Sequence, residues 1–136
     1  MKSRLFVLSV FLITVSFALV SVANAQEAPS LEVLEATICK EVLDRAPLDA
    51  GETFSASAGK LYCFTKIGGA ESPTEVTHVW YFGTTERAQV TLPVGSVTWR
   101  TWSSKIIQPF DIGQWFVDVV DPDGKVLKTL QFKVTP

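Results

Sequence analysis

The residues of this chain that could perform chemistry are few and are spread along the sequence. The chain has one histidine, His78, and two cysteines, Cys39 and Cys63. Because His78 has no second ligand at a metal spacing, we expect no metal site, and no motif indicates another cofactor. A cysteine nucleophile would need a partner base, and His78 lies inside an apparent strand. The pattern therefore predicts a protein without catalytic residues, which is not an enzyme.

Acidic residues near the C-terminus resemble part of a calcium loop. Asp118, Asp121 and Asp123 precede Gly124, but residues 125–128 read Lys-Val-Leu-Lys where a calcium loop would end in further oxygen ligands. Asp-Pro-Asp-Gly is instead typical of the turn of a β-hairpin. No motif supports the paired carboxylates of a glycoside hydrolase, whose positions depend on the fold and not on spacing.

The richest cluster of functional residue types is the segment 97–105, VTWRTWSSK. If this segment is extended, alternate residues face opposite sides, so Trp99 and Trp102 lie on different faces. A tryptophan displayed beside an arginine could stack on a sugar ring or anchor a partner chain, whereas a packed one would only fill the core. On the first interpretation the cluster is a binding surface, and its residues are Arg100, Trp102, Ser103, Ser104 and Lys105.

The elements that would position this cluster are strands. Apolar and β-branched runs that end at Gly or Pro recur about every ten residues, and no helix is indicated beyond the N-terminus. We expect a loop at 103–112, a long irregular connection at 40–59 with a short edge strand near Phe54, and an edge position for the strand that contains Pro93. Trp80 and Trp115 should lie in the core. The expected strands cover residues 31–39, 61–67, 74–82, 87–94, 97–102, 113–120 and 124–134.

Seven strands with this spacing predict an all-β fold, a single antiparallel β-sandwich of immunoglobulin-like arrangement. The domain should cover residues 26–136, because residues 1–25 have the features of a signal peptide. Lys2 and Arg4 precede an apolar run, which ends at Ala23-Asn24-Ala25. An uncleaved anchor is the alternative, since the run is almost long enough to span a membrane.

Cleavage after Ala25 would leave ten basic and fourteen acidic residues, a net charge of −4. Such a chain is a poor partner for nucleic acid or an anionic membrane, and we expect no membrane insertion after cleavage. Export to the periplasm or beyond would place Cys39 and Cys63 where disulfides persist, so we predict a bond between them. The alternative is two buried thiols, since Cys63 lies in the apolar run LYCF.

Four motifs in order, LYCFTKI, THVWYF, WRTWSSK and GQWFVDVVDPDGKVL, resemble the bacterial family called domain of unknown function 2914, over roughly Ala36 to Val134. The resemblance implies a small β-rich module that is exported or membrane-linked, with no established activity. We therefore expect a non-catalytic module that binds a cell-envelope protein, or alternatively a carbohydrate or envelope polymer. An exposed pair of coplanar aromatic rings would favour the polymer, and a bare sheet edge the protein.

Overall fold

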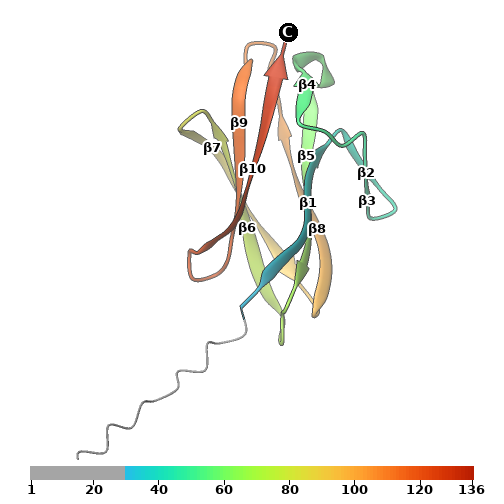
Figure 1. Cartoon of the computed structure of the whole chain (residues 1–136), viewed down its shortest axis with the longest axis vertical. Coiled ribbons are helices and arrows are strands. Elements are labelled where there is room, and N and C mark those ends of the chain that lie inside the picture. Colours follow the sequence, from blue (N-terminus) through green and yellow to red (C-terminus); the bar gives the residue numbers. More distant parts are fainter. Residues whose placement is uncertain (1–29) are drawn as a thin grey trace, which may run out of the picture.

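The computed structural model describes residues 30–136, which form ten strands and one turn of 3-10 helix, η1 (Ala56–Ala58) (Figure 1). The all-β prediction is confirmed. In chain order the strands are β1 (Glu32–Cys39), β2 (Glu41–Leu43), β3 (Ala46–Leu48), β4 (Thr53–Ser55), β5 (Lys60–Gly68), β6 (Thr74–Phe82), β7 (Thr85–Val94), β8 (Thr98–Ile106), β9 (Gly113–Val120) and β10 (Val126–Thr135).

The strands are arranged in three sheets. One sheet has the order β1-β5-β8, the second has the order β4-β10-β9-β6-β7, and β2 pairs only with β3. All pairs are antiparallel except β4 with β10, which is parallel. In Figure 1 the two larger sheets form two layers, and the β2–β3 hairpin projects to one side. Strand β7 ends the five-stranded sheet, which confirms the edge position predicted from Pro93.

One hydrophobic core joins the two larger sheets. The three-stranded sheet contributes Ile38, Leu61 and Ile67, and the other sheet contributes aromatic residues of β6, β9 and β10. Trp80 and Trp115 are both fully buried, as predicted. Their rings meet at Phe132, which stacks on Trp115 at a centroid distance of 5.9 Å and meets Trp80 edge to face at 6.1 Å.

Two local predictions were wrong. The segment expected as a loop from Ser103 begins as strand, because β8 continues to Ile106 and pairs with β5 along its whole length. The irregular connection at 40–59 contains the β2–β3 hairpin, whose two-residue turn places Asp44 and Arg45 at positive φ (50° and 62°) without a glycine. The short strand predicted near Phe54 is β4, at the end of its sheet.

The predicted signal peptide and its cleavage after Ala25 lie outside the described residues. Within residues 30–136, the structure has no helix that is long and apolar enough to cross a membrane.

Candidate functional site

Strand β8 divides the predicted binding cluster between its two faces. Arg100 and Ser104 are exposed and Trp102 is half-buried, and alternation places all three on the face that points away from the core. Ser103 lies on the opposite face and is only 4% exposed. Lys105 shares the parity of Ser103, is half-buried, and its Nζ donates to the Ile106 carbonyl at 3.3 Å. The structure therefore brings together three of the five predicted residues and removes Ser103 from the surface.

Neighbouring strands extend this surface. Residues on β5 with the same orientation are Tyr62, Phe64 and Lys66, which lie opposite Ser104, Trp102 and Arg100. We call this set of six residues the outer face. Phe64 is 1% exposed, and the Trp102 ring stacks on it at 6.2 Å with an angle of 18° between the planes. Trp102 is therefore held in place by a buried neighbour while part of its own surface remains accessible.

Two positive charges lie directly opposite each other on the outer face. Lys66 of β5 is the cross-strand partner of Arg100 of β8. The ion pair found within residues 30–136 joins Arg87 to Asp111, so neither Lys66 nor Arg100 has a carboxylate oxygen within 4.0 Å. Like charges directly opposite each other destabilise a sheet. On its other side Lys66 lies opposite Glu35 of β1, without forming an ion pair with it. The outer face thus combines a half-buried tryptophan with two opposed cations, neither of which is in an ion pair within residues 30–136.

The core side of β8 belongs to a buried polar network. His78 of β6 lies between two hydroxyls, with Nδ1 2.7 Å from Ser103 Oγ and Nε2 3.2 Å from Thr65 Oγ1. Trp80 Nε1 donates to Ser103 Oγ at 3.1 Å, and Thr65 Oγ1 donates to the Thr101 carbonyl at 2.8 Å. Because β6 lies in one sheet and β5 and β8 in the other, the three bonds made by His78 and Trp80 join the two layers.

The donors of this network define the protonation of the imidazole. Since Thr65 Oγ1 already donates its proton, it accepts from Nε2, and we assign the proton to that nitrogen. Nδ1 then accepts from Ser103, whose oxygen accepts from Trp80. Every group is satisfied when His78 is neutral, and burial lowers the pKa of His78 to about 4.

A serine within 2.7 Å of a histidine is also the arrangement of an activated nucleophile, but this pair lacks the access that such chemistry requires. His78 has no exposed surface and Ser103 has 4%. The imidazole nitrogen that does not face Ser103 meets a threonine hydroxyl and not a carboxylate. The pair is therefore structural. The polar residues at core-facing positions, Thr65, His78, Thr101 and Ser103, were the sequence signal for this network.

Cys39 and Cys63 are buried free thiols, and the structure does not contain the predicted disulfide. The register pairs Cys63 with Ile38 and Cys39 with Tyr62, so alternation directs the two cysteine side chains to opposite sides of the sheet. A bridge requires Cβ atoms that face each other. Burial raises the pKa of both thiols, which keeps them protonated and unreactive. The structure agrees with the alternative of two buried thiols, and the disulfide stays a prediction.

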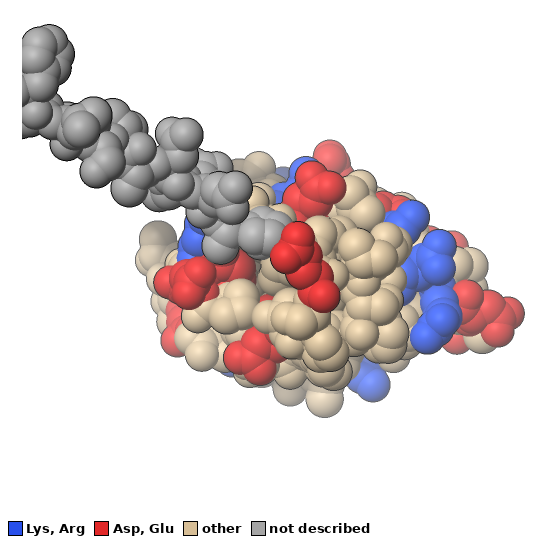
Figure 2. Space-filling model, turned by 90° about the horizontal axis from the view of Figure 1, so that it is seen from below, with Lys and Arg blue, Asp and Glu red and all other residues tan. Residues whose placement is uncertain are grey.

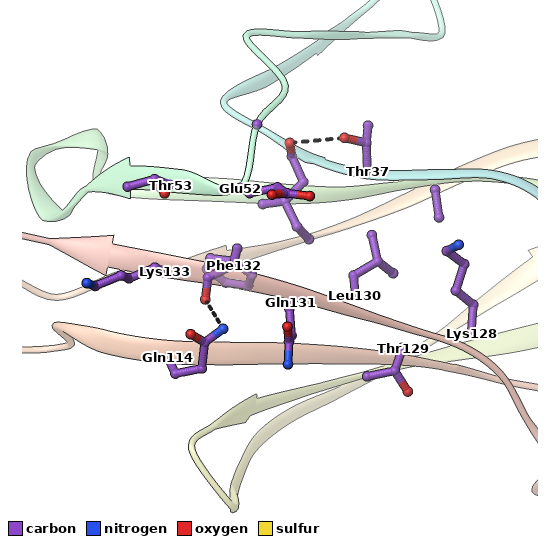
Figure 3. Close-up of a pocket in the computed structure, with 13 residues that line it drawn as sticks. Thr37, Glu52, Thr53, Gln114, Lys128, Thr129, Leu130, Gln131, Phe132 and Lys133 are labelled. Atoms are coloured by element: carbon purple, nitrogen blue, oxygen red, sulfur yellow. Dashed lines mark hydrogen bonds between the residues drawn. The ribbon is translucent and has the colours of Figure 1, made fainter.

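A groove of about 480 Å³ lies between the edge of β1 and the edge of β10 (Figure 3). Its lining is mostly polar, and Lys128 and Leu130 point from β10 toward β1. The segment Gly51–Thr53 closes one end. The residues that line the groove are Ala36, Thr37, Ile38, Gly51, Glu52, Thr53, Gln114, Lys128, Thr129, Leu130, Gln131, Phe132 and Lys133.

A second hollow, of about 310 Å³, has Glu71, Asp121 and Asp123 among its lining residues. Figure 2 shows the molecule from below, and on this side several acidic side chains lie apart from one another. The described part of the chain contains no group of three or more His, Cys, Asp or Glu side chains placed to hold a metal ion. We assign no site to this hollow.

Comparison with known families covers the second half of the domain. Residues 73–134 match the family described as "Protein of unknown function (DUF2914)". The DUF2914 match confirms the resemblance over β6 to β9 and most of β10, which carry three of the four motifs; LYCFTKI lies before it. The family description assigns no activity. No curated protein matches the chain.

Proposed function

We propose that this protein is a non-catalytic interaction module that binds an acidic protein partner through its outer face. The observation that carries the proposal is the opposition of Lys66 and Arg100 beside Trp102, where neither cation forms an ion pair within the described residues, although Glu35 of β1 lies opposite Lys66 on its other side. A carboxylate from a partner would remove the repulsion between the two cations and could accept two parallel bonds from the arginine. Tryptophan and arginine are also the residue types enriched at binding hot spots.

The alternative, binding of a carbohydrate or envelope polymer, has weaker support from the aromatic residues. Trp102 and Phe64 are almost parallel, but Phe64 is 1% exposed, so the pair does not offer two accessible rings to a sugar. Open strand edges favour a protein partner, since main-chain groups at an edge can recognise another polypeptide. The burial of the Ser103–His78 pair supports the non-catalytic interpretation.

We also infer an immunoglobulin-like sandwich for the fold. The orders β1-β5-β8 and β10-β9-β6-β7 support it, because the chain alternates between two antiparallel sheets that share one core. The seven predicted strands correspond to these seven long strands, and the short β2, β3 and β4 are additions. Export behind a signal peptide of residues 1–25, and hence a periplasmic partner, is part of the same proposal and rests on the sequence alone.

The test is a pull-down from cell-envelope extract with the wild type, Arg100→Ala and Trp102→Ala. Lys125→Ala is the matched control, since it removes an exposed cation from the β9–β10 turn. We expect wild type and control to capture the same acidic partner, and both outer-face variants to lose it. Thermal melts must first establish that each variant is folded. The proposal is rejected if folded Arg100→Ala and Trp102→Ala proteins retain every partner, or if a glycan is what the outer face captures.

A further inference from the structure

We propose that the groove between β1 and β10 is a second binding site, which takes an extended strand of a partner polypeptide. The strand would add to the open edge of β10, next to the section that β4 already occupies. This site lies on different strands from the outer face, and its recognition depends on main-chain groups and not on the charges of Lys66 and Arg100.

The open edge follows from the pairing of β10. The Lys133 amide donates to the Glu52 carbonyl at 2.8 Å, so the main-chain groups of Lys133 point toward β4. Strand β4 pairs only with residues 133–135 of β10. Because main-chain groups two residues apart point to the same side of a strand, the N–H and C=O of Gln131 and Thr129 point to this side as well, where no strand among residues 30–136 pairs with them.

The opposite wall of the groove is the edge of β1, whose pairing on that side, within residues 30–136, is limited to the bridge between Ile38 and Gly51. Strand β1 pairs with β5 on one side, and the Ile38 carbonyl on its other side accepts from the Gly51 amide at 3.0 Å. By the same alternation, the main-chain groups of Ala36 point to the groove side. A docked chain would therefore pair with β10 while it lies against the free edge of β1.

An extended polypeptide fits these features better than another ligand. Only a polypeptide backbone presents donors and acceptors at the spacing of a strand. The volume of about 480 Å³ falls within the ordinary range of binding pockets. Strand β4 limits the open section at one end, and the irregularity between Val126 and Lys128 limits it at the other, so the partner strand pairs over about four residues.

The charge of the groove favours a strand from a different protein over a second copy of this chain as the occupant. Lys128 and Lys133 line the groove and are exposed, and Glu52 is the one acid among its lining residues. A second copy would bring the same two lysines to the shared edge, which is a common device against edge-to-edge pairing. A partner strand that carries an acidic residue beside Lys128 meets no such repulsion.

The test uses a substitution that removes one main-chain donor. Gln131→Pro deletes the Gln131 N–H on the groove side and leaves the bonds from β10 to β9 intact, because proline is tolerated where the missing N–H faces an open edge. Gln131→Ala is the matched control, since it removes the same side chain and keeps the N–H. Thr129→Pro repeats the test at the other open position, so that one unfolded variant does not decide the outcome.

Peptides selected from a random dodecapeptide library against the purified protein serve as probes. We expect the selected peptides to be extended, to bind wild type and Gln131→Ala equally, and to bind the proline variants at least tenfold more weakly. They should also slow amide hydrogen exchange at Thr129 and Gln131 of the wild type. Equal binding to a folded proline variant, no change in exchange at these amides, or a library without binders would overturn the proposal. A dimer of the free wild-type protein that becomes a monomer in Gln131→Pro would also overturn the proposal, because a second copy of this chain would then occupy the edge of β10.

Discussion

The buried histidine makes the stability of the domain depend on pH, and the effect can be calculated from the structure. Burial lowers the pKa of His78 from 6.5 to about 4, so the unfolded chain binds the proton more readily than the folded chain does. The stabilisation is complete above pH 6.5 and is lost as the pH falls toward 4. Each unit between the two pKa values is worth about 1.4 kcal/mol, so the loss is about 3 kcal/mol.

The assay is urea unfolding followed by tryptophan fluorescence at several pH values between 7.5 and 4.5, with wild type and His78→Gln. His78 is the chain's one histidine, so the carboxylates are the groups that titrate in both proteins. We expect the free energy of unfolding of the wild type to fall steeply over this range, and that of His78→Gln to fall only by the shared contribution of the carboxylates. Equal pH dependence in the two proteins would refute the neutral, buried imidazole and the proton assignment that follows from it.

Three further predictions concern the core and the cysteines. Trp115→Ala should lower the free energy of unfolding by roughly 3–5 kcal/mol, because the indole is fully buried against other aromatic rings; a loss below about 1 kcal/mol in urea unfolding would contradict its place in the core. Asp111→Ala leaves Arg87, 29% exposed, without its 3.2 Å ion pair, and should cost on the order of 2 kcal/mol in the same assay; no measurable cost would mean that the pair is dispensable. Titration of the unfolded, unreduced protein should find two thiols, because the side chains of Cys39 and Cys63 lie on opposite sides of the sheet; a count of zero would mean that the disulfide predicted from the sequence forms after export.

The strands whose bounds could be predicted are those that have a glycine at one end in the sequence. Strands β6 and β9 have the predicted bounds, since Gly83 follows the first and Gly113 opens the second. The end of β8 was missed because Ser103 to Lys105 are polar, and only the pairing with β5 keeps them extended. The β2–β3 hairpin was missed because its turn has Asp44 and Arg45 where glycine or asparagine is usual.

Only the part of the outer face that lies on β8 could be predicted from the sequence. Alternation along β8 correctly placed Arg100 and Trp102 on one face, but it also places Ser103 on the other, which the expected loop concealed. Lys66 and Phe64 could not be found, because their contribution depends on the register between β5 and β8, two strands about 35 residues apart in the chain. The groove depends on where β4 stops along β10, a tertiary feature without a sequence motif.

Site-specific photo-cross-linking tests the outer face most directly. A photoreactive amino acid replaces Ser104, an exposed residue of the outer face that lies directly opposite Tyr62, in cells that produce the protein. The matched control position is Glu86, an exposed residue of β7 in the other sheet. The proposed function predicts a discrete adduct with an acidic protein from position 104, which is absent from position 86 and is lost when Arg100→Glu is added to the position 104 variant. No adduct at position 104, or the same adducts from both positions, would contradict it.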